Sequence, residues 1–268
     1  FNPLPVNPEK SGQRSPRVVL TVFFGMLLVA LWAVIGWGIQ RSHADVESTA
    51  RRELSNLSWA FAETVEASVN TLDIALQDLR EDWLREPAQF AERVEFKQRR
   101  LAKEVEFEAA IIGANGRLQY SSREPQAGSI EMSDRAYFQI HKNRQEDDLF
   151  ISNPLLGRIS NRWSMLFTRP IFDQVGRFEG VIVLSVASDH FMRHSETFNF
   201  QEGSTSSLMD RYGHVLARWP APVGQADGKL GVDPLLAAID SSGEGWIEQP
   251  SAFDQVNRLH RWRKVQGQ

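Results

Sequence analysis

The chain has 268 residues, of which 42% are hydrophobic, and its formal net charge is -4. This length and apolar content are enough for one or two modest domains with buried cores, in addition to any membrane segment. Binding to the phosphate backbone of a nucleic acid requires a concentrated basic face, which this slightly acidic chain lacks, so we expect no nucleic-acid partner. The absence of cysteine excludes disulfides, thiolate metal sites and cysteine nucleophiles.

The first residues are rich in proline and small polar side chains and show no apolar period. We expect residues 1–17 to form a flexible cytoplasmic leader. The sequence begins with phenylalanine and stops within a predicted strand, so we also expect it to be a fragment of a longer protein.

Residues 18–40 contain no charged side chain. A helix of this length reaches roughly 34 Å, which is enough to cross the hydrocarbon core of a bilayer, and Trp32 and Trp37 suit its far interface. The alternative is a cleaved signal peptide, because residues 42–44 resemble a small-x-small cleavage site. The apolar stretch is longer than a typical signal core, so the sequence predicts a transmembrane helix.

The distribution of positive charges around this stretch weakly favours an orientation with the N-terminus inside the cell. Three basic residues lie among the ten that precede it, and only Arg41 lies among the ten that follow. Counting twenty residues on each side adds Arg51 and Arg52 and removes the difference. The charge rule alone leaves the orientation open.

Residues 42–104 have the pattern of a long helix followed by a second helix. Apolar side chains recur at spacings of three, four or seven from Leu57 to Trp83, and we expect one helix over residues 42–85. Pro87 ends it, and a second helix is predicted over residues 88–103. The simplest role of the apolar stripe is core packing, although a helix that continues from a membrane segment can also transmit motion.

The period then changes to that of β-strands. Asn115-Gly116 between two apolar runs is a strong hairpin signal, and Ser133 is expected to cap a helix with Asp134 in its first turn. The order of elements predicts an α+β fold, an antiparallel sheet with helices on one face. The predicted strands are 107–112, 117–120, 149–152, 163–172 and 178–187, and the predicted helix is 134–145.

A shorter version of this pattern follows. The phrases IIGANGRLQYSS and SLMDRYGHVLARWP each give a strand, a polar turn with glycine and a second strand. We therefore expect two stacked PAS-like modules, over residues 105–200 and 201–268, of which the second is incomplete. Its predicted elements are a connecting helix over 189–200, strands at 206–210, 214–219, 245–248 and 257–265, and a helix at 234–240.

With its elements in this order, the chain resembles a double Cache (dCache) domain, the extracytoplasmic sensor of bacterial membrane signalling proteins. The resemblance covers about residues 42–268 and depends on two phrases: the stretch from SDRAYFQIHKNRQEDDLF to VIVLSVASDHF, and LMDRYGHVLARWP. It implies a ligand in the membrane-distal module (105–200) and a homodimer through the long helix. It also implies a second membrane helix and a cytoplasmic output domain beyond this sequence, since the chain is more similar to the sensor halves of GGDEF diguanylate cyclases than to those of chemoreceptors.

The resemblance also points to ligand-binding residues. Many modules of this family hold the carboxylate of an amino acid with an Arg-x-Trp-Tyr phrase, which Arg135, Tyr137 and Phe138 match loosely, and the amine with an aspartate that Asp189 matches. A guanidinium clamps a carboxylate in a fork, and aromatic walls strengthen the contact. Asn153-Pro154 stand where further amine ligands are usual, so the ligand is left open between an amino acid, an organic acid and another small molecule.

Three residues around the loop GRISNRW, namely Arg158, Trp163 and Arg169, are further candidates for contact with an anion. Their alternative roles are a solvated loop residue for Arg158, a core residue for Trp163 and a surface or ion-paired arginine for Arg169.

Metal and catalytic sites are not expected. His190 and His194 are four residues apart, but no third ligand is evident, so we expect a surface pair, no metal and no cofactor. Nucleophile, P-loop and dinucleotide motifs are absent from the sequence.

The sequence thus predicts a non-enzymatic, ligand-sensing receptor region in the bacterial inner membrane, with the sensor in the periplasm or extracellular space. A diguanylate cyclase output is expected; a sensor histidine kinase, or a module that only dimerises or binds proteins, remains the alternative. A membrane-anchored enzyme ranks last.

Overall fold

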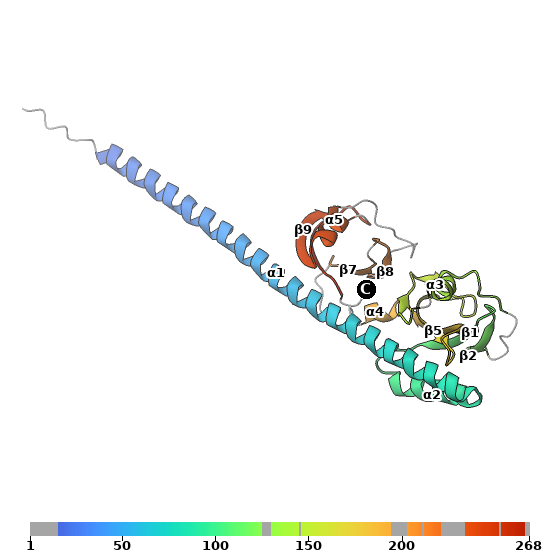
Figure 1. Ribbon diagram of the computed structural model, residues 1–268. Helices are drawn as coiled ribbons and strands as arrows, with labels where there is room; N and C mark the ends of the chain where they lie inside the picture. The colour runs from blue at the N-terminus through green and yellow to red at the C-terminus, as the bar shows by residue number, and fades with distance from the viewer. Residues whose placement is uncertain are drawn as a thin grey trace, which may run out of the picture. The chain divides into compact units, whose positions relative to one another are not determined.

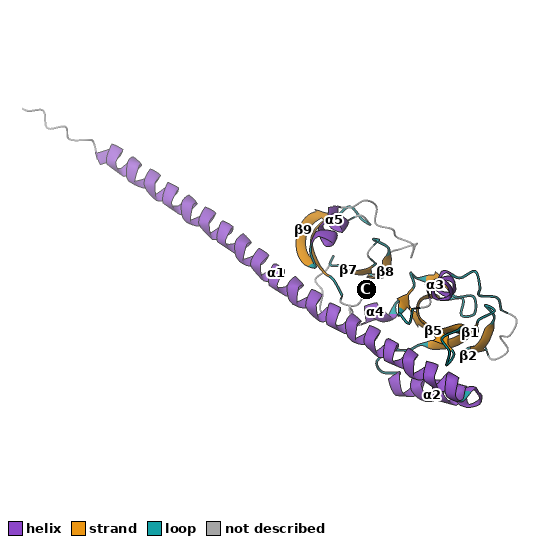
Figure 2. Ribbon diagram, in the orientation of Figure 1, coloured by secondary structure: helices purple, strands orange, loops and turns teal. Residues whose placement is uncertain are grey.

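The fold is taken from a computed structural model, which describes residues 16–124, 130–144, 146–193, 203–210, 212–220, 234–251 and 253–265. The chain divides into two compact units, Phe1–Ser55 and Asn56–Gln268, which are described separately. Figure 1 gives the labels of the helices and strands, and Figure 2 separates helix, strand and loop by colour.

The apolar stretch lies in helix α1 (Pro16–Arg85), so the helices predicted at 18–40 and 42–85 are parts of one element. Among the described residues, one helix is long and apolar enough to cross a membrane, with a mean hydropathy of 1.9 over its best 18-residue window and none of that window buried. Aliphatic and aromatic side chains from Leu20 to Ile39 are exposed all round the helix. Such a surface has the length and composition that a lipid environment requires.

The second unit is built around a six-stranded antiparallel sheet with the order β2-β1-β6-β5-β3, in which β4 also pairs with β5. The strand pairs β1–β2 and β5–β6 are hairpins, as the turn signals at Asn115-Gly116 and 173–176 predict. β4 is the one strand of this sheet that was not predicted. The strands are β1 (Glu108–Gly113), β2 (Leu118–Ser121), β3 (Phe150–Ile151), β4 (Leu155–Leu156), β5 (Trp163–Phe172) and β6 (Phe178–Ala187).

The two faces of the sheet are covered by different helices. Alternate residues of β6, such as Ile182 and Leu184, join a core that includes Leu72, Leu76 and other side chains of α1. The intervening residues of β6, such as Val181, pack in a second cluster with α3 (Ala136–Arg144). The prediction that the helices share one face is therefore wrong, because both faces of this sheet are apolar and each needs a cover.

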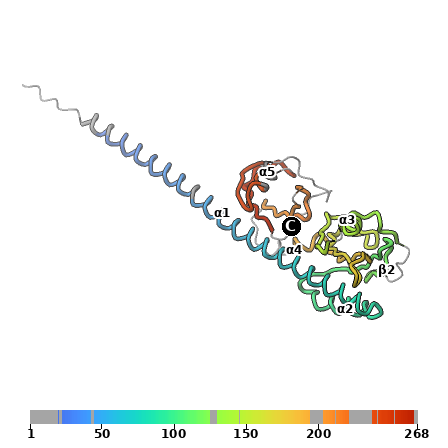
Figure 3. The backbone as a smooth tube through the Cα atoms, viewed as in Figure 1, coloured from blue at the N-terminus to red at the C-terminus, as the bar shows by residue number. Residues whose placement is uncertain are grey.

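The break at Pro87 is confirmed, and Figure 3 shows the chain turning there from α1 into α2 (Phe90–Leu101). Phe90 packs between α1 and the sheet. Its ring contacts the rings of Trp83 and Tyr120 edge to face, with centroid distances of 5.1 and 4.8 Å. Lys97 of α2 forms an ion pair with Asp78 of α1.

Helix α3 begins later than predicted. Residues 132–135 form a turn in which the Arg135 amide donates to the Met132 carbonyl at 3.1 Å, and the helix starts at Ala136. Ser133 is therefore not its cap, and Asp134 lies outside its first turn. The carboxylate of Asp134 is instead bound to Arg158, which competes with a capping role.

The C-terminal part of the second unit contains two separate antiparallel ribbons, β7–β8 and β9–β10. Ala217 of β8 is buried in the same core cluster as Phe191 of α4. The connecting helix predicted over 189–200 is described only as α4, and the rest of that prediction lies outside the described residues. The elements are α4 (His190–Arg193), β7 (Ser206–Met209), β8 (Val215–Trp219), α5 (Pro234–Ser241), β9 (Glu244–Pro250) and β10 (Asn257–Arg263).

Gly180 is required where β6 pairs with the end of β1, opposite Gly113. Its φ is +152°, and a Cβ atom there would lie 2.1 Å from the Ile112 carbonyl oxygen, which is backbone and cannot rotate away. We expect Gly180→Ala to lower the free energy of unfolding by about 2 kcal/mol in urea titrations. Gly176→Ala is the matched control, because φ is +80° but nothing lies within 4 Å, so it should cost about 1 kcal/mol. Equal losses would contradict the close strand contact.

Candidate functional site

A pocket that opens to solvent lies on the α3 side of the sheet, and the empty space in it, open solvent included, is about 550 Å³. Its lining comes from β1, β2, β5 and β6, from the start of α3 and the turn before it, and from β4 and the loop after it. Most of the lining is apolar, as in ligand pockets generally. The lining residues are Glu108, Ala109, Ala110, Ile112, Leu118, Ser121, Met132, Arg135, Tyr137, Leu155, Gly157, Arg158, Ile159, Ser160, Leu166, Val183 and Ser185.

Arg135 brings a positive charge to this apolar cavity. It belongs to the turn that precedes α3 and is half-buried. Within the described part of the chain, its guanidinium has no hydrogen bond and no ion pair. A half-buried cation of this kind is stabilised when an anion enters.

Tyr137 also lines the cavity and carries a buried hydroxyl group. The residue is 4% exposed, and among the described residues its hydroxyl donates only to the sulfur of Met132, at 4.0 Å, which is a weak acceptor. Burial raises the pKa of Tyr137 to about 12, and the charges of Arg135 and Arg158 act on it in the opposite direction. The hydroxyl therefore stays protonated at neutral pH and can donate a hydrogen bond to a ligand.

The acidic groups around the cavity are already paired. Arg158 binds both carboxylate oxygens of Asp134 at 2.8 and 2.5 Å and donates to the Glu131 carbonyl at 2.6 Å. The hydrogen bonds from Arg158 lower the pKa of Asp134 below its usual range. On the opposite side, Glu108 accepts a 2.5 Å ion-paired hydrogen bond from Arg123.

The structure brings three of the seven predicted site residues together at the cavity, namely Arg135, Tyr137 and Arg158. The other four lie elsewhere. Phe138 is fully buried in the cluster beneath α3, Trp163 is 42% exposed, and Asp189 is exposed in the turn after β6. Arg169 lies on the opposite face of the sheet.

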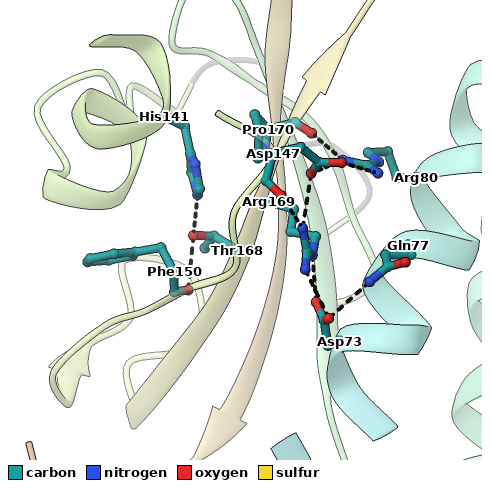
Figure 4. A network of polar contacts seen from close by, with 9 residues as sticks. All are labelled: Asp73, Gln77, Arg80, His141, Asp147, Phe150, Thr168, Arg169 and Pro170. Atoms are coloured by element: carbon teal, nitrogen blue, oxygen red, sulfur yellow. Dashed lines mark hydrogen bonds and ion pairs between the residues drawn. The ribbon is translucent and has the colours of Figure 1, made fainter. Parts of the chain in front are cut away.

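Arg169 is the centre of an ion-pair network between the sheet and α1 (Figure 4). Its guanidinium binds both oxygens of Asp73 on α1, at 2.5 and 2.9 Å, and donates to the carbonyl and carboxylate of Asp147 at 2.6 and 3.0 Å. Arg80 of α1 also binds Asp147 and donates to the Pro170 carbonyl. The hydrogen bond from Arg80 is the main reason that the pKa of Asp147 is lowered.

His141 lies on the other face of β5, next to this network (Figure 4). It is buried and its Nε2 is 2.9 Å from the Thr168 hydroxyl oxygen, which in turn donates to the Phe150 carbonyl. Burial lowers the pKa of His141 to about 4, so the ring is neutral at physiological pH.

This burial predicts an acid-sensitive stability. Between the pKa of His141 in the folded protein, about 4, and that of an unfolded histidine near 6.5, the unfolded chain binds the extra proton, so stability falls as the pH falls. We expect the free energy of unfolding to drop by roughly 2 kcal/mol from this group between pH 7 and pH 5.

The comparison of urea titrations of the parent chain and His141→Gln at pH 7 and pH 5 isolates the effect of this histidine, because the variant cannot take up the proton. Between pH 7 and pH 5 the stability of His141→Gln should therefore fall by roughly 2 kcal/mol less than that of the parent chain. Identical pH dependences of the two proteins would contradict the prediction.

No group of three potential metal ligands occurs in the described ranges. His190 is buried rather than on the surface, because α4 packs against the core, so the expectation of a surface pair is wrong for this residue. His194 lies outside the described residues.

Neither the known family profiles nor the curated proteins contain a match to this chain. Solved structures do match. The extracellular domain of rpHK1S-Z16, described as a histidine kinase, is 28% identical and has a TM-score of 0.73 over 82% of this chain and 90% of that one. The chain therefore has the fold of Cache-type extracellular sensor domains.

Two chemoreceptor domains share the fold of this sensor domain at lower identity. The ligand-binding domain of Campylobacter jejuni Tlp3, in complex with L-norvaline, has a TM-score of 0.58 at 16% identity over 82% of this chain and 88% of that one. That of Pseudomonas fluorescens CtaA, in complex with L-serine, has a TM-score of 0.54 at 12% identity over 80% and 96%. The predicted sensor fold is thereby confirmed.

Proposed function

We propose that the chain is the ligand-sensing, extracytoplasmic region of a bacterial transmembrane receptor, anchored in the inner membrane by the apolar part of α1. The observation that carries this proposal is the apolar cavity with a buried tyrosine hydroxyl and an arginine that has no ion pair within the described residues, in a domain that shares its fold with extracellular sensor domains. Residues 105–200 form the ligand-binding, membrane-distal module, and residues 201–268 belong to the membrane-proximal one.

The ligand is a small molecule, either an organic acid or an amino acid. The chemoreceptor domains that share the fold bind L-norvaline and L-serine, which supports a ligand of this size. Arg135, Tyr137 and Arg158 are the residues that we assign to its polar end. Phe138, Trp163, Arg169 and Asp189 do not line the cavity, so we assign them no contact with the ligand.

Occupancy of the cavity alters the equilibrium between two states of the sheet and α1. Leu166 of β5 lines the cavity, and Arg169 three residues later binds Asp73 of α1 on the opposite face. A ligand shifts this equilibrium only by its difference in affinity for the two states, so a tenfold preference supplies about 1.4 kcal/mol. The homodimer forms along the outward face of α1, where Trp59 and Ile74 are 54% and 60% exposed.

The signal controls a cytoplasmic output domain, for which we favour a diguanylate cyclase. The match to a histidine-kinase domain supports phosphorelay as the second candidate. Neither output resides in the residues described above. Expression of the sensor fused to each type of output, with cyclic-di-GMP and autophosphorylation as the two readouts, distinguishes them.

A thermal-shift screen of the full chain in lipid nanodiscs against organic acids and amino acids tests the proposal. We expect at least one compound to raise the melting temperature of the parent chain but not that of Ser185→Trp, in which an indole fills the cavity next to Val183. Val175→Trp is the control, since Val175 is 74% exposed in the β5–β6 turn. A screen without any stabilising compound, or hits that Ser185→Trp binds equally well, would contradict ligand sensing in this cavity.

A further inference from the structure

We infer that the cavity selects a monocarboxylate with an apolar body and discriminates against the corresponding α-amino acid. This inference rests on the proposed function and deepens it, because it decides between the two ligand classes. Three observations on the described residues carry it: the apolar lining, the charge of Arg135 that none of them pairs with, and the lack among them of an available carboxylate for an ammonium group.

The body of the cavity fits an aliphatic or aromatic group. Ile112, Leu118, Val183 and Leu166 come from four strands and converge on it, and Ile159 covers it from the loop after β4. Removal of a hydrocarbon chain from water onto such a lining is favourable in proportion to the buried apolar area. A ligand that is polar along its whole length would leave hydrogen-bonding groups unsatisfied against these side chains.

The polar end fits a single anion. The guanidinium of Arg135 has no hydrogen bond or ion pair within the described ranges, and the Tyr137 hydroxyl has only a sulfur acceptor. Both groups are donors, and both residues line the cavity from nearby positions at the start of α3. A carboxylate supplies two acceptor oxygens and one negative charge, which satisfies both groups at once.

An ammonium group has no comparable place. Among the described lining residues, Glu108 alone carries a carboxylate, and Arg123 already forms an ion pair with it. Asp134 binds Arg158 through both of its oxygens. Residues 125–129, which follow β2, contain no acidic side chain in the sequence. An amino acid would therefore bring a second charge into the cavity without a partner, and burial of such a charge is costly.

The experiment compares three ligands that share one carbon skeleton. 4-Methylpentanoate, L-leucine and 4-methylpentanamide differ only in the α-ammonium group and in the charge of the acid. Binding to the full chain in nanodiscs is measured by calorimetry at neutral pH, alongside monocarboxylates from acetate to octanoate and benzoate, which locate the best apolar body.

We expect the best monocarboxylate to bind at least about 30-fold more tightly than its α-amino acid and its amide. Arg135→Gln should weaken binding of the acid roughly 10- to 100-fold but leave the weak binding of the amide unchanged. Tyr137→Phe, which keeps the ring, should weaken binding of the acid several-fold. Arg117→Gln is the matched control, because this arginine is exposed, pairs with Glu131 and does not line the cavity.

Amino acids that bind as tightly as the acids, or an Arg135→Gln variant that retains full affinity for the acid, would overturn the inference. Binding of leucine that Ser185→Trp abolishes would overturn the ligand class but leave the sensing cavity in place. The absence of binding by every acid, amino acid and amide, with the chain folded by its cooperative melting, would contradict the proposed function itself.

Discussion

Arg169→Leu should lower the free energy of unfolding of the second unit by about 3 kcal/mol, because it leaves two acceptors without their main partner. Asp73, whose side chain is 22% exposed, would keep only its 2.9 Å hydrogen bond from Gln77. The Asp147 carbonyl would lose its donor as well. Urea titration of the full chain in detergent, followed by tryptophan fluorescence, measures the change.

A double-mutant cycle with Asp73→Leu separates the ion pair from packing. Since the double variant removes both charges, we expect it to be more stable than the sum of the single losses predicts, by about 1 to 2 kcal/mol. Arg177→Leu is the control: Arg177 also pairs with an aspartate at 2.7 Å, but its side chain is 79% exposed, so the loss should stay below about 0.5 kcal/mol. Equal effects of Arg169→Leu and Arg177→Leu would contradict the structural role of the network.

Two acidic residues in the apolar part of α1 should remove the chain from the membrane. In Val29→Asp/Ala33→Asp the charges lie one helical turn apart near the middle of residues 18–40. Each costs about 2.5 to 3.5 kcal/mol at a bilayer centre, so the pair costs roughly 5 to 7 kcal/mol. We expect most of the variant in the supernatant after alkaline extraction of membranes, whereas the parent chain stays in the pellet.

Ile74→Asp is the matched control for this experiment, because Ile74 is 60% exposed on α1 but lies beyond the apolar stretch. It should remain in the pellet with the parent chain. Extraction of the parent chain itself, or retention of the doubly substituted variant, would show that residues 18–40 do not anchor the protein.

Most of the sheet was predictable because its signals are local. β5 and β6 have the predicted bounds, since two long apolar runs flank a turn with Gly176, and the break at Pro87 follows from the missing amide of proline. The start of α3 was not predictable from Ser133 alone. The partner of Asp134 is Arg158, 24 residues away, and a local capping rule has no information on such a contact.

The candidate site was predicted in part. Arg135 and Tyr137 were chosen through the family resemblance and Arg158 from the loop GRISNRW, and all three line the cavity. Ser185, Glu108 and Met132 were missed, because a strand serine or an isolated methionine carries no functional signal until the strands are paired.

The alternation of side chains along β5 indicates on which face of the sheet Arg169 lies. Met165 and Phe167 belong to the core on the α1 side, whereas Leu166 lines the cavity on the other face. Arg169 has the parity of Phe167, so it had to face α1 once one side of the strand was assigned. Its partner Asp73, 96 residues earlier, could be identified only from the tertiary structure.

The central claim is that the cavity-bearing domain lies outside the cell. Because the chain has no cysteine, a single introduced thiol can report this location directly. Val175→Cys places one thiol in the β5–β6 turn, where the parent side chain is 74% exposed. We predict that a membrane-impermeant maleimide labels this variant in intact spheroplasts as fully as after lysis. Labelling that occurs only after lysis would place the domain in the cytoplasm and contradict the account.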